Sequence, residues 1–442
     1  MRILLAIVTD QDLDHDSMDV KTAFLYPPLK SDDRTWLRRP RGLTDAHMPP
    51  VVELLKSIYG LPKASQYFEE YLSAHLLKLG FKRTISDKQL FIFRRPDNCI
   101  CYLSTHVDDI FLACTKDSGL NDWVREQLAL VFTLSHRPQT TVHLGLVLER
   151  DCNNKSLKIS QPHYVSEILT RFGISSSSPS SIVDSPMSEF FLRDMHLHST
   201  DPILDSTQIT VFQEIVGCLQ YLTDQTRPDL KYSTNQLSRR SLSPTARDMK
   251  AAKRVLRYLS QTLSYGITFC TYGLPFELFV TVDVSYNCYP DSKSHTGFSF
   301  HLGRFSGTVF SFSRKQAIIA DSSTSAEFIG THKACQQIGW TQNLLSEMGI
   351  PISSPTVVYQ DNMSTIKLIA HKGNEARTKH IDLRYNVIRE FLQQARIVVR
   401  YLSTENMIAD MLTKPLPGPS FSRLTSRLMN LSPPTDLDLT LV

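Results

Sequence analysis

The sequence lacks long apolar stretches, paired cysteines and internal repeats, and each absence excludes a class of protein. No apolar stretch approaches the length needed to span a membrane, and the short apolar run in the opening residues MRILLAIVTD has no h-region or cleavage site of a secretory leader. The eight cysteines form no C-x-x-C pair and no His–Cys metal spacing. No segment repeats with a fixed period. Membrane, disulfide-scaffold, zinc-finger and repeat architectures are therefore disfavoured, and we expect an intracellular protein with free thiols.

The composition is that of an ordinary globular chain with enough apolar residues for sizeable cores. Of 442 residues, 41% are hydrophobic and 21% are charged, and the length predicts two to four domains. The formal net charge of +4 permits a nucleic-acid partner but does not argue for one, because it says nothing of where the charge lies.

Ser- and Pro-rich stretches divide the chain. The clearest linker is ISSSSPSSIVDSP, residues 174–186, and the segment after Pro415 is similar in composition. Between them we distinguish a mixed block of strands and helices (1 to about 150), a helical block (200 to about 265) and an alternating strand–helix block (276–415).

Two adjacent carboxylates occupy an otherwise apolar stretch, LSTHVDDIFL. The flanking runs predict two short strands joined by a hairpin with Asp108 and Asp109 at its tip, and Asp19 ends another strand-like segment. Three carboxylates brought together in this way would suit Mg²⁺ and phosphoryl chemistry. The alternative is a plain turn, since Asp is common in turns.

A second acidic set lies in the last block, where each acid falls near the end of a predicted strand or within a predicted helix. Its members are Asp283 in the alternating run LFVTVDVS, Glu327 in the helical pattern of residues 322–349, Asp361 after the strand-like TVVYQ, and Asp410 in a helix predicted over residues 403–414. Acids that converge only after folding are what a metal-dependent nuclease requires. The alternative for each is a helix cap or an exposed charge, and Asp361 in particular could cap the helix that follows it.

One predicted helix, ARDMKAAKRVLRYL, carries its cations at spacings of three and four, which places them on one face. They are Arg247, Lys250, Arg254 and Arg257. This face could contact nucleic-acid phosphates, or it could be an ordinary solvated surface, and the sequence does not decide between the two.

Several motifs in fixed order resemble the reverse transcriptase and RNase H region of copia-type LTR retrotransposon Pol polyproteins. They begin with MDVKTAFLYPPL, ELLKSIYGLPKASQYF and HVDDI, and continue through EIVGCLQYLTDQTRPDL and AAKRVLRYLSQT to RTKHIDLR and IADMLTKPL. The resemblance covers nearly the whole chain.

By this resemblance, Asp19, Asp108 and Asp109 would be the metal ligands of a polymerase palm. Phe24 would lie under the sugar of the incoming nucleotide, with an ordinary core position as the alternative. In YGLPKAS, Tyr59 and Gly60 would pack near the template and the incoming base, and Lys63 would meet a phosphate. One departure is His106, where the family usually has an aromatic residue.

The resemblance also implies an RNase H domain in which Asp283, Glu327, Asp361 and Asp410 bind the catalytic ions. His380 would lie near its substrate or be structural. The fold expected is an α+β and α/β multidomain chain: a right-hand polymerase palm and thumb, a helical connection, then an RNase H-like mixed sheet with flanking helices. The expected boundaries are palm 1–150 with incomplete fingers, thumb-like segment and linker 151–199, connection 200–275, RNase H 276–415 and tail 416–442.

The function implied is RNA- and DNA-directed DNA synthesis combined with RNase H activity, by two-metal chemistry with Mg²⁺ or Mn²⁺. Partners would be an RNA template, a DNA primer, an RNA–DNA hybrid and deoxynucleoside triphosphates, with no membrane; the oligomeric state is left open. The location expected is cytoplasmic, with the nucleus as an alternative. Because family members carry fingers residues upstream of RILLAIVTD, the rival interpretation is an inactive, truncated retrotransposon remnant that at most binds nucleic acid.

Overall fold

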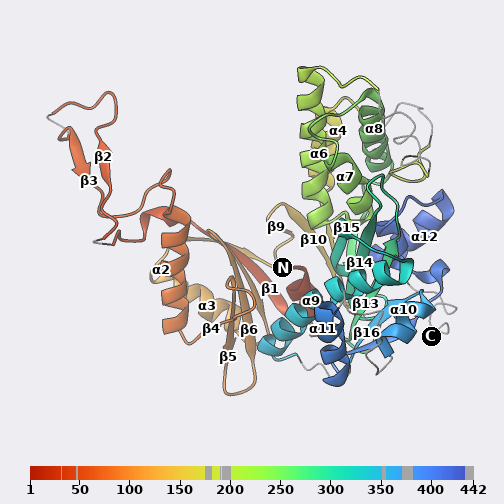
Figure 1. Cartoon of the computed structure of the whole chain (residues 1–442). Helices are drawn as coiled ribbons and strands as arrows, with labels where there is room; N and C mark the ends of the chain where they lie inside the picture. The colour runs from red at the N-terminus through yellow and green to blue at the C-terminus, as the bar shows by residue number, and fades with distance from the viewer. Residues whose placement is uncertain are drawn as a thin grey trace. The chain divides into compact units, whose positions relative to one another are not determined.

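The computed structural model describes residues 1–30, 32–45, 48–174, 182–189, 191, 201–350, 355–370 and 382–433. The chain divides into two compact units, a smaller one (Gln11–Leu144) and a larger one (Met1–Asp10 with Gly145–Val442). The fold is mixed α+β with several sheets (Figure 1). Among the described residues no helix is long and apolar enough to cross a membrane, and all eight cysteines are free thiols.

An antiparallel sheet in the order β4-β5-β6-β7-β1-β8 forms the smaller unit. β6 and β7 are the predicted hairpin, and β1, which comes much earlier in the sequence, pairs with β7 along its whole length. The sheet therefore brings an early acidic segment beside the hairpin. Its strands are β1 (Asp14–Val20), β4 (Lys82–Arg83), β5 (Leu90–Arg94), β6 (Ile100–His106), β7 (Asp109–Cys114) and β8 (Leu134–Pro138).

Helices α2 (Ala64–Lys78) and α3 (Leu120–Ala129) cover one face of this sheet. Their buried side chains share a core with Met18 of β1 and Leu112 of β7. Successive strand residues point to opposite faces, so the residue next to each of these two lies on the other face, away from α2 and α3. The remaining described elements of the unit are η1 (Ala23–Leu25), β2 (Trp36–Arg38), β3 (Val51–Glu53) and β9 (Val142–His143).

The larger unit contains a five-stranded sheet in the order β15-β14-β13-β16-β17. The first three strands are antiparallel, and β16 and β17 join them in parallel. Helix α9 packs against β13 and β14 and ends at Gly349, whose φ of +75° suits a glycine. The bounds are β13 (Leu278–Ser285), β14 (Lys293–Leu302), β15 (Thr308–Ile319), α9 (Ser323–Met348), β16 (Thr356–Gln360), α10 (Met363–Ala370), α11 (Asp382–Gln393), β17 (Ile397–Tyr401), η4 (Thr404–Asn406) and η5 (Ile408–Leu412).

A second part of the larger unit is helical, as the sequence predicts for residues 200–265. Its helices share one apolar core, to which Phe212, Leu219, Leu256 and Phe421 belong. Strands β10 (Leu146–Asp151), β11 (Ser156–Ser160) and β12 (Gly266–Phe269) form an antiparallel group that α1 contacts. The helices of this core are α4 (Pro162–Arg171), α6 (Ser206–Gln225), η2 (Pro228–Leu230), α7 (Lys231–Ser238), α8 (Ala246–Gln261) and α12 (Gly418–Met429), whereas α1 (Arg2–Asp10) packs on the strands.

A buried ion pair fixes the turn between α6 and α7. Arg227 Nη2 lies 2.8 Å from Asp229 Oδ2, and both side chains are almost fully buried. The same guanidinium donates to the backbone oxygen and hydroxyl of Thr262 and lies over the ring of Tyr258. These contacts attach the turn to the end of α8. They also provide partners for the buried guanidinium of Arg227, which would be costly to bury without them. The finer division into palm, thumb, connection and RNase H remains a prediction.

Candidate functional site

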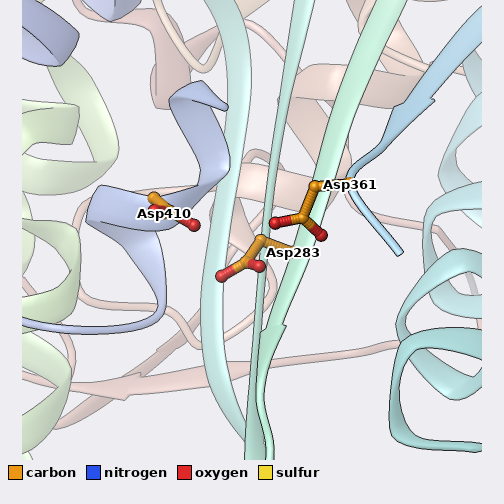
Figure 2. A group of neighbouring side chains, drawn as sticks. All are labelled: Asp283, Asp361 and Asp410. Carbon is orange, nitrogen blue, oxygen red and sulfur yellow. The ribbon is translucent and has the colours of Figure 1, made fainter. Parts of the chain in front are cut away.

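Three aspartates from distant parts of the sequence meet at one edge of the five-stranded sheet. β13 and β16 are parallel neighbours, with Thr281 opposite Tyr359. Asp283 and Asp361 each follow two residues later, so the two acids reach the same edge. Asp410 comes from η5. Figure 2 shows the three side chains converging on one place.

The spacing of these carboxylates suits a shared cation. One oxygen from each of Asp283, Asp361 and Asp410 lies within 4.8 Å of the other two. Thr413 Oγ1 donates a hydrogen bond to Asp283 Oδ2, and Thr404 Oγ1 donates one of 2.9 Å to Asp361 Oδ2. Each hydroxyl therefore fixes the orientation of its carboxylate.

Asp410 is held differently. Its Oδ1 is buried and accepts no well-aligned hydrogen bond within the described structure. Lys414 Nζ lies 2.9 Å from this oxygen as an ion pair. A buried carboxylate oxygen with a single cationic neighbour has capacity left for a further ligand.

Burial and mutual repulsion perturb the titration of this cluster. Burial, followed by the charge of Asp283, raises the pKa of Asp410 to about 7, with Lys414 opposing the shift. Burial also raises the pKa of Asp283 against the opposing effect of Lys414. For Lys414, burial acts to lower the pKa, but the carboxylates of Asp283 and Asp410 outweigh it and the pKa is raised. Burial therefore disfavours the ionised forms of Asp283 and Asp410, and the neighbouring carboxylates add to this effect.

Glu327 lies beside the three aspartates but outside the group that can share one ion. It sits in the second turn of α9, which begins at the N-cap Ser322. Glu327 Oε1 accepts from the Val284 backbone N–H at 3.3 Å, and Oε2 accepts from Gln360 Nε2 at 3.2 Å. Burial and the nearby Asp283 raise its pKa well above the usual value.

The donor set fits a hard divalent cation. Carboxylate oxygens are the ligands that Mg²⁺ and Mn²⁺ take in proteins, and the group holds no thiol or imidazole. Three buried or half-buried carboxylates within 4.8 Å, one with an oxygen that accepts no hydrogen bond, also need positive charge nearby. These residues therefore fit the ion that the sequence implies.

One local prediction around this cluster is wrong, and one alternative is excluded. The segment 403–414 is not one helix but the 3₁₀ turns η4 and η5, because the N–H groups of Asn406, Asp410 and Thr413 each donate to the carbonyl three residues earlier, and Pro415 stops further helix. Asp361 does not cap α10, since Asn362 Oδ1 accepts from Thr365 N at 3.0 Å. Asp361 is thus left available to the acidic cluster.

In the smaller unit, Asp19, Asp108 and Asp109 come together at the end of the β6–β7 hairpin. Asp19 is directly opposite Asp109, and Val20 N donates to Asp108 O at 2.9 Å. Because the Val20–Asp108 pair is hydrogen-bonded, the Asp19–Asp109 pair is of the alternate kind, in which side chains lie closest. Both acids lie on the sheet face away from α2 and α3. The hairpin turns at Val107, whose φ of +56° is strained for a β-branched residue.

These three acids are close without forming a preorganised three-ligand group. Burial, followed by the charges of Asp108 and Asp19, raises the pKa of Asp109. Like charges directly opposite in a sheet repel. Among the described residues, however, the only group whose ligand atoms lie within 4.8 Å of one another is that of the larger unit.

The predicted nucleotide-binding residues lie together in part. The rings of Phe24 and Tyr59 are in contact, with centroids 4.9 Å apart, although Tyr59 is 57% exposed. Gly60 has a φ of +97°, as a turn glycine should. Lys63 Nζ donates to Asp33 Oδ2 at 2.8 Å, so a phosphate would have to displace this ion pair.

Two of the four predicted cations of α8 already have acidic partners. Arg247 pairs with Asp201 at 2.6 Å, and Arg254 pairs with Asp184 at 3.4 Å. Lys250 is exposed and Arg257 is half-buried. His106 ends β6 opposite Asp109, whereas His380 lies outside the described residues.

Sequence reasoning missed the residues that surround the acidic cluster, namely Thr404, Thr413, Lys414 and Gln360. Thr413 and Lys414 were visible in the motif IADMLTKPL, since a hydroxyl and a cation follow the acid three and four residues later. Gln360 precedes Asp361, but nothing in its neighbours shows that it contacts Glu327.

Comparisons with a family model and with known proteins agree on one family for this chain. Residues 1–187 match the model of the family described as reverse transcriptase (RNA-dependent DNA polymerase). Over 430 residues, 97% of this chain, the sequence is 33% identical to the retrovirus-related Pol polyprotein from transposon RE2 of Arabidopsis thaliana, of which it covers 28%. It is 30% identical over 426 residues, 95% of this chain, to the Pol polyprotein from transposon TNT 1-94 of Nicotiana tabacum, of which it covers 31%.

A solved structure of the foamy viral protease-reverse transcriptase in complex with dsDNA aligns with 88% of this chain and 68% of that chain, at 12% identity and a TM-score of 0.44. The chain spans less than a third of the length of the two curated relatives above. The match to the RE2 polyprotein covers 97% of this chain, and the reverse transcriptase model covers its first 187 residues. The chain thus belongs to the family of copia-type transposon Pol polyproteins, and its residues 1–187 match the reverse transcriptase model.

Proposed function

We propose that the acidic cluster of the larger unit hydrolyses the RNA strand of an RNA–DNA hybrid in a metal-dependent reaction, as an RNase H. The observation that carries the proposal is the convergence of Asp283, Asp361 and Asp410 within 4.8 Å, with Glu327 beside them. Membership of a family described as an RNA-dependent DNA polymerase supports the substrate, because copying RNA into DNA produces such a hybrid.

Mg²⁺ or Mn²⁺, when bound, would supply the Lewis acidity that activates water and stabilises charge on the phosphate. The chain contributes the positioning. Thr413 and Thr404 orient the carboxylates of Asp283 and Asp361, and Gln360 holds Glu327 Oε2. Burial and the charge of Asp283 raise the pKa of Glu327, which favours a role for this carboxylate in proton transfer.

A second activity, RNA- and DNA-directed DNA synthesis, is proposed for the smaller unit as a polymerase palm. The supporting observation is the Asp19–Asp109 cross-strand pair with Asp108 at the strained hairpin tip. Like charges directly opposite one another in a sheet are destabilising, and a bound cation would remove this repulsion. The contact of Phe24 with Tyr59 would give the deoxynucleoside triphosphate an apolar support.

The proposed substrates require contacts with the sugar-phosphate backbone. Lys250 on the exposed face of α8 would provide one such contact, and Arg257 another. Replacing Lys250 should weaken hybrid binding without changing sequence preference. The alternative function is a remnant that binds nucleic acid without either reaction.

One gel assay separates these outcomes. The purified chain is incubated with Mg²⁺, deoxynucleoside triphosphates and a labelled RNA–DNA hybrid with a recessed DNA primer. The variants are Asp361→Asn, Asp109→Asn and, as a matched control, the exposed Asp321→Asn. We expect RNA cleavage that is lost only in Asp361→Asn, and primer extension that is lost only in Asp109→Asn. Cleavage without extension would leave the nuclease alone. Neither product from the wild-type chain would refute both activities.

A further inference from the structure

Lys414 is placed against the acidic cluster by the backbone that carries Asp410. The Lys414 N–H donates to Asp410 O at 3.1 Å, so the chain makes one turn between the two residues. This turn brings Lys414 Nζ to 2.9 Å from Asp410 Oδ1. The residue before a proline disfavours the α-helical backbone conformation, so Pro415 restricts the backbone angles of Lys414.

The ion pair joins two side chains of different exposure. The Asp410 side chain is only 7% exposed, whereas that of Lys414 is 36% exposed. The lysine stem can therefore swing towards solvent while the carboxylate stays in place. The contact is also a single ion pair without a well-aligned hydrogen bond to Asp410 Oδ1, which makes it easier to exchange than a bidentate pair.

Among the described residues, the Lys414–Asp410 ion pair is the only one formed by a carboxylate of the cluster. Asp283 and Asp361 are held by hydroxyl groups, which orient the carboxylates but do not neutralise them. A cluster of three carboxylates with one ammonium remains net negative. The Lys414 ammonium lies against Asp410 Oδ1, an oxygen that a divalent cation bound to the cluster would also use.

We propose that Lys414 is a positioning residue that stands in for a divalent cation: it stabilises the three carboxylates before the metal binds and leaves Asp410 Oδ1 when the metal arrives. This inference rests on the proposed metal-dependent nuclease. It assigns Lys414 two opposite effects, because the residue stabilises the metal-free fold and weakens metal binding. A residue that only supported the structure would have the first effect without the second.

The test measures metal binding directly by isothermal titration calorimetry with Mn²⁺ on the full chain. Lys414→Met should bind Mn²⁺ at least fivefold more tightly than wild type, since the ion no longer displaces an ammonium. Lys414→Arg, which keeps the charge, should stay within twofold of wild type. Lys367→Met makes the same charge change at an exposed position on α10 and should also stay within twofold.

Thermal unfolding supplies the second measurement. Without metal, Lys414→Met should melt at a lower temperature than wild type, and with saturating Mn²⁺ the two should coincide. If Lys414→Met does not fold, Lys414→Gln takes its place in both measurements. Equal or weaker binding by the neutral variant would overturn the role of Lys414. Equal binding by wild type and Asp361→Asn would instead overturn the metal site itself.

Discussion

Replacing Asp410 by Asn should make the metal-free protein more stable at alkaline pH and less sensitive to pH. In the folded chain, burial and Asp283 raise the pKa of Asp410 from 3.8 to about 7. An acid with a raised folded pKa binds its proton more tightly in the native state than in the unfolded state. Stability therefore falls as pH rises through the interval between the two values, and it is lowest above the folded pKa.

The size of the effect follows from the shift. About three pKa units correspond to about 4 kcal/mol in total, of which roughly half or more is lost between pH 5 and pH 8. Asn cannot ionise, so Asp410→Asn should remove most of this pH dependence. Excess Mg²⁺ should also stabilise the wild-type chain more at pH 8 than at pH 5, because the ligands must be deprotonated to bind it.

The assay is urea unfolding in EDTA at pH 5 and pH 8, followed by far-UV circular dichroism, for wild type, Asp410→Asn and the exposed-site control Asp321→Asn. The control should keep the wild-type difference between the two pH values. If Asp410→Asn keeps it as well, the carboxylate is not the source of the pH dependence and the argument from burial is refuted.

Three further predictions concern stability. Val107→Gly should raise the melting temperature of the smaller unit's transition, by a gain of about 0.5–1 kcal/mol, because it removes a β-branched residue from positive φ; a lower melting temperature would contradict this. Asp109→Asn should stabilise the chain in EDTA by up to about 1 kcal/mol by ending the repulsion from Asp19, and the gain should shrink when Asp19→Asn is already present. Arg227→Met should cost about 3–5 kcal/mol in urea unfolding because it leaves Asp229 buried and unpaired, and Arg227→Met/Asp229→Leu should recover most of it; a single variant as stable as wild type would show that the pair is not needed.

Local patterns in the sequence were enough to predict most elements that carry acids. The alternation in LFVTVDVS, the apolar runs on either side of Val107 and the junction after TVVYQ all correspond to strands in the structure. Their acids therefore lie at the predicted ends. These predictions held because period-two alternation and turn chemistry are local properties of the chain.

The rest depends on contacts between distant segments. The IADML segment has helical periodicity, yet hydrogen bonds to Asp410 O and the following proline keep it to a 3₁₀ turn. The closeness of Asp283 and Asp361 follows from the parallel pairing of β13 with β16, which no local pattern reveals. Likewise, the cation next to Asp410 became meaningful only when the backbone turn placed Lys414 against it.

Helix α1 is synthesised well before the strands against which it packs. Its residues Ile3–Thr9 are buried, and it contacts β11, β12 and β15 of the larger unit, which lie more than a hundred residues further along the chain. While the smaller unit is being synthesised, this apolar helix has none of its final partners in place and is a candidate for capture by chaperones. A chain ended near residue 150 would leave the helix in the same state for good, so its solubility would be poor even if the sheet around Asp19 and Asp109 folded correctly.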